Sequence, residues 1–71
     1  MNGHEFFRRL VRLGRERGVA VRFAEERGKG SHGTVYYGDR RTTLKDRRAE
    51  IGEGLLNAML RQLGLTKRDL L

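Results

Sequence analysis

The fold is decided by one stretch of the chain, residues 31–45, which reads Ser31-His32-Gly33-Thr34-Val35-Tyr36-Tyr37-Gly38-Asp39-Arg40-Arg41-Thr42-Thr43-Leu44-Lys45. Its β-branched and aromatic residues are typical of strands, which we expect over about 31–37 and 40–45. Between them, Gly38-Asp39 fits a two-residue turn, with glycine at the first central position as a type II′ turn requires. The stretch therefore predicts an antiparallel β-hairpin.

Counting outward from this turn gives the register of the hairpin. The opposed pairs are Tyr37–Arg40, Tyr36–Arg41, Val35–Thr42, Thr34–Thr43, Gly33–Leu44 and His32–Lys45. Because successive side chains of a strand point to opposite faces, the pairs divide into two sets. The face expected beneath the helices receives Gly33, Val35, Thr42 and Leu44. The opposite face receives His32, Thr34, Tyr36, Arg41, Thr43 and Lys45.

A helix and a further strand are expected before the hairpin. Phe6, Leu10 and Leu13 recur at helical spacing, which predicts a helix over about 3–16. Asn2 and Glu5 resemble a capping box that opens this helix, and a glycine at position 18 is expected to end it. Residues 19–24 alternate in the manner of a half-buried strand, and the polar, glycine-rich run 25–30 is expected to be a loop.

A second amphipathic helix is expected after the hairpin, near 53–63. Gly64 closes it, and Thr66 with Asp69 looks like a capping pair for a last short turn. The order of elements is then α-β-β-β-α, which defines an α+β domain. A three-stranded antiparallel sheet with both helices on one face is the natural way to pack these elements.

The composition favours a small protein with a polyanionic partner. The 71 residues are enough for one domain, which we expect to span 1–71. Sixteen lysines and arginines against nine aspartates and glutamates give a formal net charge of +7. Such an excess indicates RNA or DNA as a partner, although an acidic protein would use the same charge. No cysteine is present and no apolar run nears the roughly 18 residues of a membrane span, so we expect a cytoplasmic protein with no membrane partner.

His32 is the residue to suspect of chemistry. It lies in Gly28-Lys29-Gly30-Ser31-His32-Gly33, among small residues whose lack of side chains makes packing a poor explanation for it. An imidazole titrates near neutral pH and passes a proton in either direction. Because RNA carries its own nucleophile in the 2′-hydroxyl, one histidine beside cations could assist cleavage without a metal.

The residues expected to hold RNA are those that bring charge, hydroxyls or close backbone approach to His32. They are Lys29, Gly30, Ser31, Arg41, Lys45 and Tyr36, with Arg22 from the preceding strand. Two plainer interpretations stay open, namely that His32 is an exposed residue without a role and that Tyr36 only packs across the strands. Only His4 could add a second imidazole ligand, so we expect no metal and no other cofactor.

A literal dinucleotide-binding pattern, Gly28-x-Gly30-x-x-Gly33, is also present. It leads into a predicted strand, whereas a dinucleotide site requires a helix at that point. We therefore assign it no nucleotide-binding role.

Three segments resemble the HicA toxin family of bacterial and archaeal type II toxin–antitoxin systems. These segments are Gly28-Lys29-Gly30-Ser31-His32, Tyr37-Gly38-Asp39-Arg40-Arg41-Thr42-Thr43 and Leu60-Arg61-Gln62-Leu63-Gly64-Leu65. The resemblance covers nearly the whole chain. It implies a fold similar to the double-stranded-RNA-binding domain, an mRNA interferase activity with His32 as the catalytic histidine, and a cognate HicB-type antitoxin that covers the active site.

The leading hypothesis is therefore a metal-independent endoribonuclease toxin with His32 as general acid or base. The alternatives are a non-catalytic RNA-binding module that uses the same basic face and a chain that acts mainly by binding a protein.

Overall fold

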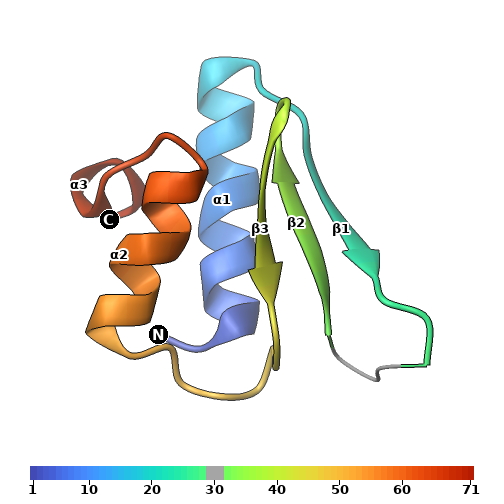
Figure 1. The fold of residues 1–71 in the computed structure, drawn as a ribbon. Helices are drawn as coiled ribbons and strands as arrows, with labels where there is room; N and C mark the ends of the chain where they lie inside the picture. The colour runs from blue at the N-terminus through green and yellow to red at the C-terminus, as the bar shows by residue number, and fades with distance from the viewer. Residues whose placement is uncertain (29–31) are drawn as a thin grey trace.

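The two longer helices of the protein pack against one face of a three-stranded sheet, and a short C-terminal helix packs against the first of them (Figure 1). The computed structural model describes residues 1–28 and 32–71. Its elements are α1 (Gly3–Arg17), β1 (Val21–Glu25), β2 (Gly33–Tyr37), β3 (Arg40–Leu44), α2 (Glu53–Gln62) and α3 (Lys67–Leu70). The predicted α-β-β-β-α order and the placement of the helices on one face are confirmed. No helix in the described ranges is long and apolar enough to span a membrane.

Helix α1 begins and ends at the residues that the sequence predicts. The Asn2 side chain accepts a hydrogen bond from Glu5 N at 2.9 Å, and Gly18 ends the helix with a left-handed φ of 68°. The predicted capping box is only half formed. The Glu5 carboxylate accepts hydrogen bonds from Arg8 and Arg9, at 2.6 and 2.9 Å, and these arginines take the place of the Asn2 backbone.

The sheet has the order β1-β2-β3, with both pairs of neighbours antiparallel. In the hairpin formed by β2 and β3, five predicted pairs, from Tyr37–Arg40 to Gly33–Leu44, are confirmed. In the turn of this hairpin Gly38 has a φ of 62° and Asp39 has a negative φ. This combination is the one that the predicted type II′ turn requires.

Four strand boundaries differ from the prediction. β2 begins at Gly33 and not at 31, and β3 ends at Leu44 and not at 45. The first strand spans Val21–Glu25 in place of 19–24, because Val19 N still donates to Gly14 O, at 2.8 Å, in the turn that ends α1. Val19 and Ala20 were therefore wrongly assigned to the strand, and Glu25 was wrongly assigned to the loop.

The core lies between the sheet and the helices. Its fully buried side chains come from α1, β2 and the C-terminal half of α2, and they are Phe6, Leu10, Val35, Leu60 and Leu63. Beneath β3, the Thr42 hydroxyl donates to the Gln62 amide oxygen at 2.5 Å, so the one buried polar side chain of the described core has a partner. The predicted capping pair of Thr66 and Asp69 is confirmed as a full capping box at the start of α3.

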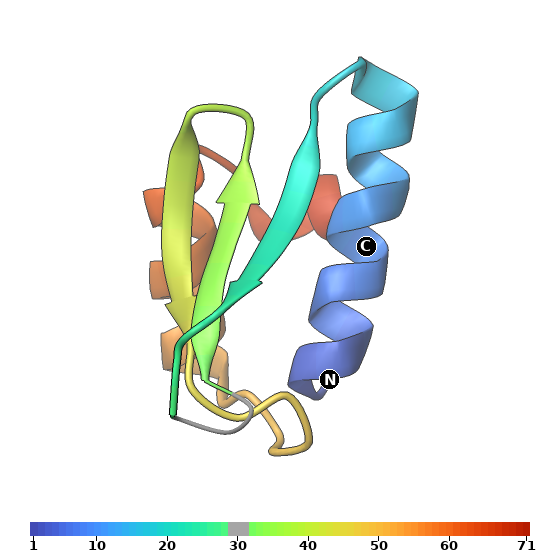
Figure 2. The ribbon, with the colours of Figure 1, turned by 90° about the vertical axis from the view of Figure 1, so that its right-hand side faces the viewer.

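The connector between β3 and α2, residues 45–52, closes one end of the molecule. Ile51 N donates to Met1 O and His4 N donates to Arg47 O, both at 2.9 Å. The start of α1, this connector and the beginning of β2 consequently lie at the same end of the fold (Figures 1 and 2).

Candidate functional site

The helix-free face of the sheet, here called the open face, carries Arg22, Tyr36 and Arg41 of the predicted site residues. Figure 2 shows it turned toward the viewer, with α2 behind the strands. The observed register orders its side chains in rows across the three strands. One row is Arg22–Tyr36–Arg41 and the next is Ala24–Thr34–Thr43.

His32 lies one residue before β2 and is half-buried. Its carbonyl oxygen accepts a hydrogen bond from Glu26 N at 2.8 Å, which extends the β1–β2 ladder one pair beyond Glu25–Gly33. Because side chains alternate along a paired strand, this bond places His32 on the face opposite to Gly33, which is the open face. Glu25 and Glu26, which the sequence assigned to the loop, thus belong to the backbone pairing of β1 with β2, since this pairing continues regardless of the polar side chains.

The glycine that follows His32 has a packing role that the sequence did not reveal. A Cβ added to Gly33 would lie 2.4 Å from Cζ of Phe23, whose ring covers this position on the helix side. Phe23 and Gly33 are diagonal neighbours on adjacent strands. The glycine therefore leaves room for an aromatic ring against β2, on the face of the sheet opposite to His32.

Lys45 is exposed and follows the last residue of β3. The predicted pair His32–Lys45 is not part of the ladder, which ends one step earlier at Gly33–Leu44. Both residues therefore stand at the same end of the sheet. The predicted site residues Lys29, Gly30 and Ser31 lie outside the described residues.

Tyr36 stands between two arginines at the centre of the open face. The guanidinium carbon of Arg22 lies 4.3 Å from the centre of the Tyr36 ring, and Arg41 is opposed to Tyr36 on the other side. A cation over an aromatic ring is attracted by the negative face of the ring, so this contact holds Arg22 across the sheet. A hollow of about 310 Å³ beside this row is lined by Thr34, Arg41, Thr42, Thr43 and Gln62.

The arginines of the open face have no carboxylate partner in the part of the chain that the structure describes. In residues 1–28 and 32–71, no salt bridge joins Arg22, Arg41 or Lys45 to a carboxylate. The cations of the helices, in contrast, are largely paired. Hydrogen bonds from Arg9 and Arg8 lower the pKa of Glu5, and a hydrogen bond from Lys67 lowers the pKa of Glu53. The open face is therefore the surface best suited to a polyanion.

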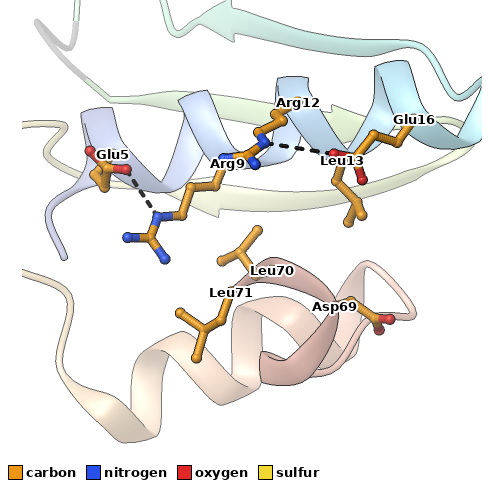
Figure 3. A pocket seen from close by; sticks show the side chains of 8 residues that line it. All are labelled: Glu5, Arg9, Arg12, Leu13, Glu16, Asp69, Leu70 and Leu71. Carbon is orange, nitrogen blue, oxygen red and sulfur yellow. Dashed lines mark hydrogen bonds and ion pairs between the residues drawn. The ribbon is translucent and has the colours of Figure 1, made fainter.

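A pocket of about 340 Å³ between α1 and α3 offers no such surface (Figure 3). Its two arginines point along α1 toward carboxylates, Arg9 toward Glu5 at 2.9 Å and Arg12 toward Glu16 at 3.6 Å. Since this charge is already balanced within the helix, the pocket has little attraction for phosphate.

The sequence analysis assigned no role to Arg47, which lies in the connector between β3 and α2. The guanidinium carbon of Arg47 lies 4.6 Å from the centre of the Phe23 ring, and its Nη2 is 3.9 Å from a carboxylate oxygen of Glu25. Arg47 therefore covers the helix side of β1 near His32. Neither its spacing nor its neighbours in the sequence signals this contact.

Known proteins provide no assignment for this arrangement. A scan of protein-family models, a search of curated proteins and a search of solved structures each return no match for the chain.

Proposed function

We propose that this protein is an endoribonuclease toxin of the HicA type, which cleaves mRNA in the cytoplasm with His32 as a general acid–base group. The observation that carries the proposal is that His32 stands at one end of the open face, which also carries the unpaired cations Arg22 and Arg41, while Lys45 follows β3 at the same end of the sheet. RNA brings a line of phosphates that these cations attract, and an imidazole is a side chain that can transfer a proton in either direction.

Cleavage would proceed by internal transfer at one phosphate. The 2′-oxygen of the RNA loses its proton and bonds to the adjacent phosphorus, the bond from phosphorus to O5′ breaks, and O5′ takes up a proton. The products are a 2′,3′-cyclic phosphate and a 5′-hydroxyl end. Lys45 stabilises the charge that develops on the phosphate oxygens, because it stands at the same end of the sheet as His32.

The row Arg22–Tyr36–Arg41 would bind the RNA at a second point, some distance from the reacting phosphate. Tyr36 lies four residues along β2 from His32, a separation of about 13 Å at the rise of a strand. A nucleotide base stacks readily on an aromatic ring or on a guanidinium plane. Thr34 and Thr43, which lie between the two ends, are small enough to let the sugar–phosphate backbone approach the sheet.

The test compares two histidine variants. Expression of the wild-type chain and of His4→Ala is expected to arrest growth and degrade mRNA, whereas expression of His32→Ala is not. His4 is the matched control because it is the other histidine of the chain and is exposed at the start of α1. Purified protein is expected to cleave RNA in the presence of EDTA. Equal toxicity of the two variants, or cleavage by His32→Ala, would remove His32 from the mechanism.

A cognate antitoxin is the second partner of this proposal. A small acidic protein encoded in an adjacent reading frame would cover the open face and block RNA. Co-expression is expected to restore growth, and substitution of Arg41 and Lys45 by glutamate is expected to weaken the complex.

The second candidate function is a non-catalytic RNA-binding module, which the distance between the Tyr36 row and His32 favours. Such a module would bind RNA with Arg22, Tyr36 and Arg41 and leave it intact. Binding by wild-type and His32→Ala chains with equal affinity, without cleavage by either, would establish this function.

A further inference from the structure

Glu26 is paired with His32 in the backbone. Its N–H donates to the His32 carbonyl oxygen at 2.8 Å, and the two residues therefore close the β1–β2 hairpin. Cβ atoms of directly opposed residues lie about 5 Å apart, which brings both side chains to one place on the sheet.

Two contacts place Glu26 and Glu25 on opposite faces. Arg47 lies over the Phe23 ring and also approaches the Glu25 carboxylate, so Glu25 is on the helix side of β1. Because neighbouring side chains alternate, Glu26 is on the open face with His32.

Glu26 is exposed, and its carboxylate makes no salt bridge or hydrogen bond within the described residues. An unpaired carboxylate weakens the attraction of this face for phosphate, so its position next to the histidine is costly for RNA binding. The other charged groups in the segments at this end are Arg27, Lys45, Asp46 and Arg47, with Lys29 in the part of the loop outside the described residues.

Internal cleavage of RNA needs two proton transfers, one from the 2′-oxygen and one to O5′. One imidazole cannot accept the first proton and donate the second at the same moment. We propose that Glu26 is the second acid–base group of this site, an inference that rests on the proposed function. The Glu26 carboxylate takes the proton of the 2′-hydroxyl as the bond from O2′ to phosphorus forms. Protonated His32 gives its proton to O5′ as the bond from phosphorus to O5′ breaks.

The first experiment measures kcat/KM against pH on an RNA oligonucleotide for the wild type and for two neighbouring variants. Glu26→Gln is expected to lower kcat/KM at least 100-fold and to abolish the acidic limb of the pH profile, since proton transfer by a positioned side chain contributes about 10²–10⁴-fold. Glu25→Gln, which changes a carboxylate on the other face, is expected to keep both limbs and a rate within about threefold of wild type. Glu26→Asp is expected to keep the acidic limb at a reduced rate.

The second experiment assigns the direction of proton transfer. In a substrate whose 5′-bridging oxygen is replaced by sulfur, the leaving thiolate needs no proton. This substrate is expected to restore the rate of His32→Ala and not that of Glu26→Gln.

Three results would overturn the proposal, and they differ from one another. An equal loss of kcat/KM in Glu25→Gln and Glu26→Gln, with both limbs of the pH profile retained, would show that Glu26 acts only through its charge. The proposed RNA cleavage by the wild type would then still stand. Rescue of Glu26→Gln by the sulfur substrate would contradict its role as the base. Failure of the wild type to cleave RNA would overturn the proposed function together with this inference.

Discussion

The ring of Phe23 fills the space that a side chain at Gly33 would occupy, directly behind His32. A Cβ at Gly33 would lie 2.4 Å from Phe23 Cζ and 2.5 Å from Ala24 O. The second of these atoms belongs to the backbone of the paired strand. Rotation of a side chain cannot relieve the approach to this backbone oxygen, so this position links the stability of the sheet to the placement of the histidine.

Gly33→Ala is therefore expected to destabilise the protein by about 1–3 kcal/mol, the usual cost of overpacking. Urea denaturation monitored by circular dichroism measures this loss. RNA cleavage should fall by more than the fraction of unfolded protein explains, because β2 must move away from β1 near His32. Gly52→Ala is the matched control, since nothing lies within 4 Å of a Cβ there, and an equal loss in both variants would contradict the argument.

Tyr36→Leu is expected to weaken binding of single-stranded RNA roughly tenfold, because a base stacked on an aromatic side chain contributes about 1–3 kcal/mol. Tyr36→Phe keeps the ring and is expected to bind like the wild type. Fluorescence anisotropy of a labelled oligonucleotide with His32→Ala protein separates binding from cleavage. Equal affinities of the leucine and phenylalanine variants would show that the ring makes no stack.

The salt dependence of binding should identify the cations that contact phosphate. Each lost contact lowers the slope of log K against log [salt] by about 0.7 for a single strand. Arg41→Ala and Lys45→Ala are each expected to show this change. Arg61→Ala, which removes an exposed cation from α2 on the other side of the molecule, is expected to leave the slope unaltered.

Asp69 should give the fold an acid-sensitive contact. A hydrogen bond from Arg17, at 2.7 Å, and bonds from Thr66 lower the pKa of Asp69 to about 2 from 3.8. The unfolded chain binds the proton first as the pH falls, so stability is lost between about pH 4 and pH 2. Thermal unfolding across this range is expected to show a flatter pH dependence for Asp69→Asn than for wild type.

The control for this prediction is Glu26→Gln, which removes a carboxylate without a salt bridge in the described ranges. It should retain the steep loss of stability in acid. If Asp69→Asn loses stability in acid as steeply as the wild type does, the contact between α1 and α3 does not contribute to folding.

The features that could be predicted from the sequence are those that depend on near neighbours. The type II′ turn at Gly38-Asp39 fixes the register of the hairpin formed by β2 and β3, and that register alone assigns Tyr36 and Arg41 to the open face. Caps at Asn2, Gly18 and Thr66 likewise depend on residues within one helical turn.

The features that could not be predicted depend on contacts between distant segments. The position of Arg47 over Phe23 requires the connector to meet β1, and no local pattern encodes that meeting. The pairing of Glu26 with His32 was concealed because a polar, glycine-rich run indicates a loop, whereas the backbone pairs whatever its side chains are. The site residues were chosen from the chemistry that their side chains offer beside His32, and their roles stay predictions.

Helix α1 is held at its two ends by late parts of the chain. Met1 O accepts from Ile51 N near its start, and Arg17 pairs with Asp69 at its end, across a sequence separation of 52 residues. During synthesis on a ribosome, the first helix therefore emerges long before either anchor exists. We expect a nascent chain to gain its closed structure only after nearly all of it has left the exit tunnel, so that a stalled or shortened product would lack the finished fold.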